Sequence, residues 1–309
     1  MSVHPSGEQW TIRSGGHEVT VVEVGGGVRT YTLEGVDVMA GYAVDEPASS
    51  GRGQLLMPWP NRIRDGRYTF EGKDQQLALT EPAFHNASHG LVRWVPWHVV
   101  EQTEDALTVG TRLHAQPGWD GVLDLSVTYA LDASGLTVTN RATNVGEATV
   151  PFGYGAHPYV AIGGTPLAEV VLQLPASQEV LVDDRMLPTG TQPVRPETDF
   201  RSARPLGSTS LDTAFTGLER DPGTGRWVVT VSGLQDRGDV RLWADESFGW
   251  LQVFTVKGAD DAPGVRGIAV EPMSCPAEAF NSGQGLVVLT LGESWSGTWG
   301  ISPSTASAG

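Results

Sequence analysis

Two residues that could exchange protons, His157 and Glu271, stand in the same local context although they are far apart in the chain. Each ends a short apolar stretch, within residues 153–157 and 267–271, and each is followed directly by proline. The proline ring biases the preceding residue toward extended backbone and away from the α region. An imidazole and a carboxylate presented from two strands can serve as a general acid and a general base. Either residue taken alone is more often structural, so the hypothesis depends on the rest of the sequence.

A basic segment, residues 57–68, offers hydrogen-bond donors that suit a polyhydroxylated ligand. Two prolines stiffen its beginning, and strand alternation is expected to place Arg62 and Arg64 on one face, with Ile63 on the other. A guanidinium fork donates to several oxygens at once, which suits an array of hydroxyl groups. The alternative is a surface turn with solvated arginines.

Two histidines, His85 and His89, stand four residues apart. This spacing binds a metal ion when both lie on one face of a helix, but Gly90 and nearby turn formers argue against a helix. We therefore interpret His89 as a hydrogen-bonding residue and His85 as an exposed loop residue, and predict no metal site. The neighbouring Trp94 and Trp97 can stack on the apolar face of a sugar, although tryptophans in a β protein more often belong to the core.

Short strands must position these side chains. Thirty-nine glycines and twenty prolines are spread along the chain and separate runs rich in Val, Thr, Leu and Trp. Residues 122–145 alternate apolar and polar side chains on both sides of a glycine-containing loop, which predicts a β-hairpin. Further strands are predicted at residues 19–24, 29–33, 107–113, 170–174, 227–231, 240–243, 250–256, 267–270 and 286–291. Without a long amphipathic helix, this pattern predicts an all-β sandwich or barrel.

We expect a single domain over residues 1–301 and a disordered tail over residues 302–309. The segment 183–211 contains four prolines and shows no periodicity, so it is either an ordered excursion over the sheets or an inserted flap. Asp212, directly after this segment, can cap a turn or bind a hydroxyl group.

The composition limits the class of partner. The 309 residues carry a formal net charge of −16, which disfavours nucleic acid and anionic membrane surfaces and favours a neutral small molecule. A single cysteine, Cys275, excludes an intrachain disulfide and a cysteine-rich metal site. The sequence shows neither a secretory signal nor an apolar run of the roughly 20 residues that span a membrane, so we predict a cytoplasmic protein.

Taken in order, seven segments resemble motifs of the aldose 1-epimerase (galactose mutarotase) family, and the resemblance extends from the N-terminal strands to about Trp299. The segments are Asn61-Arg62-Ile63 with Gly66-Arg67-Tyr68, Ser88-His89-Gly90, Gly118-Trp119-Asp120-Gly121, Ala156-His157-Pro158-Tyr159, Leu211-Asp212 with Phe215, residues 251–255, and Val270-Glu271-Pro272. The strings around Arg62 and His89 look most like a bacterial branch of mutarotase-like proteins. Two positions depart from the usual motifs and bear on which sugar the protein prefers. Gly90-Leu91 replaces two glycines, and Pro272 follows the glutamate.

The resemblance implies a large antiparallel β-sandwich, a galactose mutarotase-like supersandwich, with an open sugar-binding cleft on a concave sheet. It implies Glu271 as the general base, His157 as the general acid, and Arg62, His89 and Asp212 as substrate-binding residues, with no metal or other cofactor. The implied reaction is interconversion of the α and β anomers of an aldohexose through opening and closure of the ring.

Two alternatives stay open at the level of the sequence. An epimerase for a phosphorylated or otherwise modified sugar, such as a sulfosugar, needs additional basic side chains in the cleft. Arg64, Arg67 and Arg93 are the candidates near the motifs. A carbohydrate-binding or sensor protein could keep the fold without turnover, but it would not need both His157 and Glu271. The sequence leaves the oligomeric state open.

Overall fold

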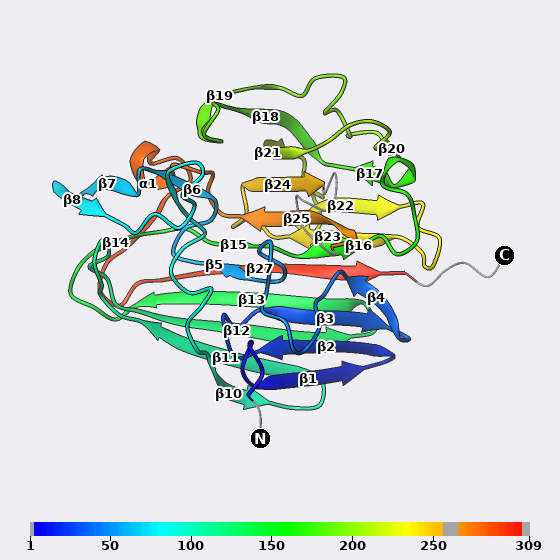
Figure 1. Cartoon of the computed structure of the whole chain (residues 1–309), viewed down its shortest axis with the longest axis horizontal. Coiled ribbons are helices and arrows are strands. Elements are labelled where there is room, and N and C mark those ends of the chain that lie inside the picture. Colours follow the sequence, from blue (N-terminus) through cyan, green and yellow to red (C-terminus); the bar gives the residue numbers. More distant parts are fainter. Residues whose placement is uncertain (1–2, 256–264, 305–309) are drawn as a thin grey trace.

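The computed structural model describes residues 3–255 and 265–304, and strands form nearly all of the regular structure (Figure 1). Two short helical segments occur in these residues, the 3-10 helix η1 (Leu167–Glu169) and the helix α1 (Ala279–Ser282). Neither described helix is long and apolar enough to cross a membrane. The strands form two large antiparallel sheets and three two-stranded ones.

The larger sheet has twelve strands. Its main path runs β1-β2-β3-β4-β16-β25-β24-β21-β18-β19, while β15 pairs with β25 and with β5. The bounds are β1 (Gln9–Ser14), β2 (His17–Val22), β3 (Val28–Leu33), β4 (Val36–Met39), β5 (Leu55–Leu56), β15 (Gly155–Ala156), β16 (Tyr159–Ala161), β18 (Ala176–Val182), β19 (Pro188–Pro193), β21 (Asp212–Leu218), β24 (Trp250–Thr255) and β25 (Gly267–Met273).

The second sheet has nine strands, in the order β10-β11-β12-β13-β27-β23-β22-β17-β20. Its strands are β10 (His98–Gln102), β11 (Ala106–Leu113), β12 (Leu123–Asp132), β13 (Gly135–Asn144), β17 (Val171–Gln173), β20 (Arg204–Pro205), β22 (Trp227–Ser232), β23 (Val240–Ala244) and β27 (Ser294–Pro303). The two-stranded sheets pair β6 (Arg62–Arg64) with β9 (Asn86–Ser88), β7 (Arg67–Phe70) with β8 (Lys73–Gln76), and β14 (Val150–Phe152) with β26 (Val287–Leu289).

The two large sheets bury one apolar core between them. In β12 the buried side chains alternate with partly exposed ones along the strand, as expected for a strand with one face in a core. Tyr31 and Val270 from the larger sheet and Tyr129 and Trp227 from the nine-stranded sheet belong to the same hydrophobic cluster. This face-to-face packing of two antiparallel sheets confirms the predicted all-β sandwich.

β25 is buried on both of its faces. Ile268 and Val270 belong to the main core, whereas Ala269 and Met273 belong to two smaller clusters. Because side chains alternate along a strand, Glu271 lies on the same face as Ala269 and Met273, away from the main core. The strand therefore separates the core from a second buried region that contains a carboxyl group.

The strands predicted from the sequence are confirmed, with ends shifted by up to three residues. The predicted hairpin is β12–β13, in which Asp132 pairs with Gly135 at the turn. Residue 256, the predicted end of one strand, lies outside the described residues. The unpredicted strands include β1 and β10, whose half-exposed side chains show no clear alternation.

The segment 183–211 is an ordered excursion and contains two strands. β19 pairs with β18 in the larger sheet, and β20 pairs with β17 in the nine-stranded sheet. Arg185 fixes the turn between β18 and β19, because it donates to Asp65 over 2.8 Å and to the main-chain oxygen of His85 over 2.8 Å. The excursion therefore bridges the two sheets and the β6–β9 pair.

The last strand is longer than the sequence indicates. Ser302 and Pro303 continue β27 and pair with Arg241 and Val240 of β23. The predicted disordered tail is therefore wrong at its first residues, where pairing with β23 satisfies the main chain. Residues 305–309 lie outside the described part of the chain, and a single domain over residues 1–301 stays a prediction.

Gly90 shapes the loop that follows β9 and provides a test of the fold. Its φ is +72°, and a Cβ at this position would lie 2.0 Å from the main-chain oxygen of Met57. We expect Gly90→Ala to lower the free energy of unfolding by more than the about 1–2 kcal/mol that left-handed backbone alone costs. Gly72→Ala is the matched control, since Gly72 has a φ of +78° with nothing within 4 Å. Urea unfolding of both variants measures the difference, and equal losses would contradict the predicted clash.

Candidate active site

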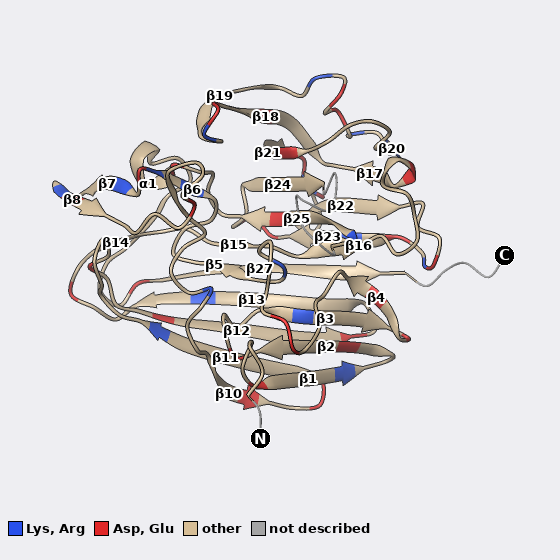
Figure 2. Cartoon of the chain, viewed as in Figure 1, with Lys and Arg blue, Asp and Glu red and all other residues tan. Residues whose placement is uncertain are grey.

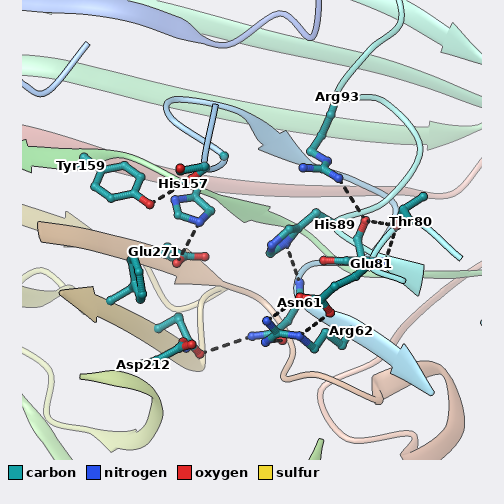
Figure 3. A pocket seen from close by; sticks show the side chains of 15 residues that line it. Asn61, Arg62, Thr80, Glu81, His89, Arg93, His157, Tyr159, Asp212 and Glu271 are labelled. Carbon is teal, nitrogen blue, oxygen red and sulfur yellow. Dashed lines mark hydrogen bonds and ion pairs between the residues drawn. The ribbon is translucent and has the colours of Figure 1, made fainter. Parts of the chain in front are cut away.

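A pocket of about 360 Å³ lies on the face of the larger sheet that points away from the main core (Figure 3). This volume is within the range of small-molecule sites. The five predicted site residues, Arg62, His89, His157, Asp212 and Glu271, all line it. The other lining residues are Ser50, Gly51, Asn61, Thr80, Glu81, Ser88, Arg93, Tyr159, Gln252 and Phe254. The fold thus gathers all the predicted side chains in one cavity.

Neighbouring strands of the larger sheet supply the floor of the pocket. Gln252 in β24 is opposite Glu271 in β25, and Asp212 in β21 is opposite Phe254 in β24. Figure 2 shows one acidic position in each of β21 and β25, which carry no other charged residue. The residues that alternate with the polar ones, such as Val253 beside Gln252 and Val270 beside Glu271, point into the core. Alternation along adjacent strands therefore places the polar groups together on one face.

His157 and Glu271 are in direct contact, with His157 Nε2 3.3 Å from Glu271 Oε1. His157 lies between β15 and β16, where its main chain donates to Gln54 O over 3.1 Å and accepts from Gly53 N over 2.9 Å. Its ring stacks on Tyr159, with centroids 5.1 Å apart. Glu271 lies inside β25, so the expectation that it ends a strand is wrong; its proline neighbour continues the strand.

Burial controls the charge of this pair. It lowers the pKa of His157 from the ordinary 6.5 to about 3, and the positive charge of Arg93 acts in the same direction. Burial also raises the pKa of Glu271 well above the ordinary 4.5, and the negative charge of Asp212 adds to the rise while Arg62 opposes it. Both shifts favour the uncharged form of the residue, an imidazole beside a protonated carboxyl group.

The contact makes the two residues one titrating unit. The uncharged pair and the ion pair contain the same number of protons and differ only in whether the proton is on Glu271 or on His157. Transfer of that proton across the contact interconverts the two forms without exchange with solvent. The pair can therefore present one proton donor and one proton acceptor to a ligand in the pocket.

His89 is a hydrogen-bonding residue, as interpreted from the sequence. Its Nδ1 accepts a hydrogen bond from the main-chain nitrogen of Asn61 over 3.2 Å, and burial keeps its pKa well below 6.5. A neutral ring whose Nδ1 accepts carries its proton on Nε2, which makes Nε2 a donor. His85 is the predicted exposed residue and contacts Asp65 over 2.8 Å. No cluster of potential metal ligands occurs among the described residues.

Arg62 is held by a carboxylate instead of being solvated. Its Nε and one terminal nitrogen donate to the two carboxylate oxygens of Glu81 over 2.8 and 2.9 Å. This two-point contact fixes the plane of the guanidinium. The predicted alternation is confirmed, because Ile63 is buried, while Arg64 turns to Asp183 and Glu278 outside the pocket. Arg62 therefore presents its remaining donors in a fixed direction.

Asp212 is the first residue of β21 and takes part in a chain of side-chain hydrogen bonds. It accepts from Gln252 Nε2 over 2.7 Å, and Gln252 Oε1 accepts from Asn61 Nδ2 over 3.3 Å. The chain links the floor of the pocket to the segment that carries Arg62. Asp212 thus begins a strand and directs its carboxylate to a side chain of the neighbouring strand.

Several lining residues were not predicted as site residues. Glu81 precedes proline, as His157 and Glu271 do, and this shared context was the one signal that could have found it. Gln252 sits two residues before Phe254, and the alternation of β24 could have placed both on one face. Neither Trp94 nor Trp97 lines the pocket, so the option of stacking on a sugar is not supported for either. Trp97 is buried in the core and Trp94 is exposed to solvent.

The shared proton of His157 and Glu271 gives folding a defined pH dependence. Below pH 4.5 the unfolded residues bind two protons, whereas the folded pair keeps one down to about pH 3, so stability falls as pH falls. Between 4.5 and 6.5 both states bind one proton, and the pair's contribution is constant. Above 6.5 the unfolded residues bind none while the folded pair keeps one, so stability falls as pH rises.

We expect this plateau when the wild type is compared with a double variant, His157→Gln with Glu271→Gln. The difference in unfolding free energy should be flat from pH 4.5 to 6.5 and should fall on both sides by about 1.4 kcal/mol per pH unit. Urea unfolding across pH measures it. A difference that stays flat over the whole pH range would show that the two residues titrate as solvated groups, and a slope between pH 4.5 and 6.5 would contradict the shared proton.

Sequence comparisons relate the whole chain to known proteins. The chain matches the aldose 1-epimerase family over residues 8–302. It is 33% identical over 294 residues to the uncharacterized protein YihR of Escherichia coli, a match that covers 94% of this chain and 92% of that protein. It is 28% identical over 222 residues to the galactose mutarotase of Homo sapiens, which covers 68% of this chain and 62% of that protein.

Solved structures share the fold. A putative aldose 1-epimerase from Escherichia coli superposes with a TM-score of 0.83 at 22% identity and covers 96% of this chain and 99% of its own. A galactose mutarotase-like protein from Clostridium acetobutylicum gives a TM-score of 0.84 at 18% identity, over 96% of this chain and 94% of its own. At these identities the likeness concerns the fold alone. The sequence match over nearly the whole chain goes further: this protein belongs to the aldose 1-epimerase family.

Proposed function

We propose that the protein interconverts the α and β anomers of an aldose by acid and base catalysis. The observation that carries the proposal is the contact between His157 and Glu271 inside a pocket whose other walls offer hydrogen-bond donors and acceptors. Ring opening needs a proton removed from the C1 hydroxyl group and a proton delivered to the ring oxygen. A buried acid and base in contact meet both needs within one cavity.

In the proposed ring opening, Glu271 takes the proton from the C1 hydroxyl group and His157 gives a proton to the ring oxygen. The C1–O5 bond breaks, its electron pair stays on O5, and C1 becomes an aldehyde. Rotation about the C1–C2 bond exposes the other face of the aldehyde to the O5 hydroxyl group. Ring closure then reverses both transfers, so that the pair ends with the number of protons with which it began.

The raised pKa of Glu271 supports its role as the base, because a carboxylate with a high pKa accepts a proton more readily than a solvated one. The role requires the ionised form, which the pair reaches when the proton of Glu271 passes to His157. That same transfer creates the imidazolium that serves as the acid. One internal proton transfer thus prepares both catalytic groups.

We propose that Arg62, His89 and Asp212 bind the sugar hydroxyl groups. Arg62 and the Nε2 of His89 are donors, whereas Asp212 is an acceptor. The three can therefore bind sugar hydroxyl groups that accept a hydrogen bond and hydroxyl groups that donate one. Glu81 fixes Arg62, Asn61 fixes the tautomer of His89, and Gln252 contacts Asp212. Donors held in place by other side chains can also stabilise negative charge that develops on oxygen during ring opening.

We expect His157→Gln and Glu271→Gln each to lower the rate of anomer conversion by at least about a hundredfold, because each removes one of the two proton transfers. Polarimetry of freshly dissolved α-glucose and α-galactose measures the rate. His85→Gln is the matched control, since this exposed histidine contacts Asp65 outside the pocket and should leave the rate unchanged. Near-wild-type turnover in either pocket variant would refute the proposed roles.

A further inference from the structure

A loop that precedes β5, residues 49–54, packs against the imidazole of His157. The proposed reaction gives this loop no role. Its main chain turns twice, through hydrogen bonds from Arg52 N to Ser49 O over 3.0 Å and from Gln54 N to Gly51 O over 2.9 Å. Ser50 and Gly51, at the middle of the loop, line the pocket.

The imidazole of His157 has few hydrogen bonds that could fix its orientation. Its Nε2 contacts Glu271, whereas its Nδ1 is buried and has no partner on another residue in the described part of the chain. A histidine that transfers protons is commonly oriented by a hydrogen bond from its second ring nitrogen. The orientation of this ring must therefore come from the groups that pack around it.

Gly51 packs against the part of the ring that contacts Glu271. A Cβ at Gly51 would lie 2.6 Å from Cδ2 of His157 and 2.9 Å from Nε2, the atom that contacts Glu271. Gly51 has a φ of +74°, in the left-handed region that glycine adopts without strain. The glycine thus lets the main chain of the loop approach the ring more closely than any other residue would allow.

Tyr159 connects the ring of His157 to the same loop (Figure 3). Its ring stacks on the imidazole at an angle of 18°, and its hydroxyl group donates to the main-chain oxygen of Ser50 over 2.9 Å. Tyr159 is buried, so this hydrogen bond is protected from water. The two groups that pack on the imidazole, the main chain of Gly51 and the ring of Tyr159, therefore hold each other in place.

Arg52 anchors the loop from the side that faces away from the pocket. Its side chain is buried and donates to Gly41 O over 2.8 Å, to Ser49 O over 3.3 Å and to Ser49 Oγ over 2.5 Å. The guanidinium also lies over the ring of Tyr42, with its carbon 5.4 Å from the ring centroid. Burial lowers the pKa of Arg52 and the charge of Glu46 opposes the fall, so the side chain keeps its donors at neutral pH.

We propose that Arg52 and Gly51 are positioning residues for the proposed acid. Arg52 holds the 49–54 loop, and the loop holds the imidazole of His157 in contact with Glu271. The inference rests on the proposed function, because it concerns the acid of that reaction. Gly51 has no side chain and Arg52 does not line the pocket, so neither offers a side-chain group to a sugar. Both act on the reaction only through His157.

The contact that the loop maintains tolerates little movement. His157 Nε2 and Glu271 Oε1 are 3.3 Å apart, at the long end of the range in which proton transfer is efficient. A displacement of about 1 Å can lower a rate by about a hundredfold. The proposed sugar-binding residues Arg62, His89 and Asp212 belong to other segments, so a shift of the loop should reduce turnover more than affinity.

Gly51→Ala tests the close approach of the loop to the ring. We expect kcat to fall by about tenfold to a hundredfold and KM to change by less than about threefold, measured by polarimetry of α-glucose and α-galactose. Gly35→Ala is the matched control, since Gly35 has a φ of +79° with nothing within 4 Å, and its kcat should match that of the wild type. Equal falls in kcat, or a raised KM with unchanged kcat in Gly51→Ala, would overturn the inference.

Arg52→Met tests the anchor without adding any atom next to the ring. We expect kcat to fall by about tenfold with KM nearly unchanged, because the loop loses its attachment to Gly41. Arg220→Met is the matched control: Arg220 donates to the main-chain oxygens of Gly225, Asp245 and Phe248, outside the pocket. Its kcat should stay at the wild-type value. A wild-type kcat in Arg52→Met, or equal falls in both arginine variants, would contradict the proposed anchor.

Nitrogen-15 NMR of histidine-labelled protein without sugar separates this inference from the proposed reaction. The signals of His157 are assigned by their loss in His157→Gln, and its Nε2 shift reports the contact with Glu271. We expect this shift to move in the same direction, toward that of a free neutral imidazole, in Gly51→Ala and Arg52→Met. Because Gly51→Ala keeps the charge of Arg52, a common change reports the position of the ring and not a lost charge.

An Nε2 shift that is unchanged in both variants would refute the positioning role, even if turnover falls. If the wild type converts neither sugar faster than the spontaneous rate, the proposed function fails. The NMR measurement then decides the inference alone, since it depends on the contact between His157 and Glu271 and not on a substrate.

Discussion

The site depends on one constraint, the burial of β25 on both faces. Ile268 and Val270 anchor the strand in the apolar core, and alternation then commits Glu271 to the opposite face. Because Glu271 and His157 are also buried on that face, they meet in a medium that disfavours their ionised forms. A solvated glutamate and histidine at the same distance would be a weaker base and a weaker donor–acceptor unit.

The walls of the pocket have to exclude water while adding as little free charge as possible. Asn61 and Gln252 join chain segments 191 residues apart through neutral amide groups. Arg62 forms an ion pair with Glu81, and His89 is a neutral ring because its pKa is low. These four wall residues are thus balanced or uncharged, as low-dielectric sites require. Arg93 lies near the charge of Glu81, which opposes the fall that burial causes in its pKa.

The sequence predicts which side chains of a strand are buried better than it predicts the contacts between distant residues. Period-two patterns identify the β12–β13 hairpin and most central strands, because a strand with one buried face has apolar residues at alternate positions. The order of the motifs also led to the expectation that His157 and Glu271 share one cleft, and the two side chains are in contact. Neither signal reveals which charges pair across long separations, so the partner of Arg62 could not be predicted from the sequence. Local propensity likewise missed the edge strands, whose stability comes from their neighbours in the sheet.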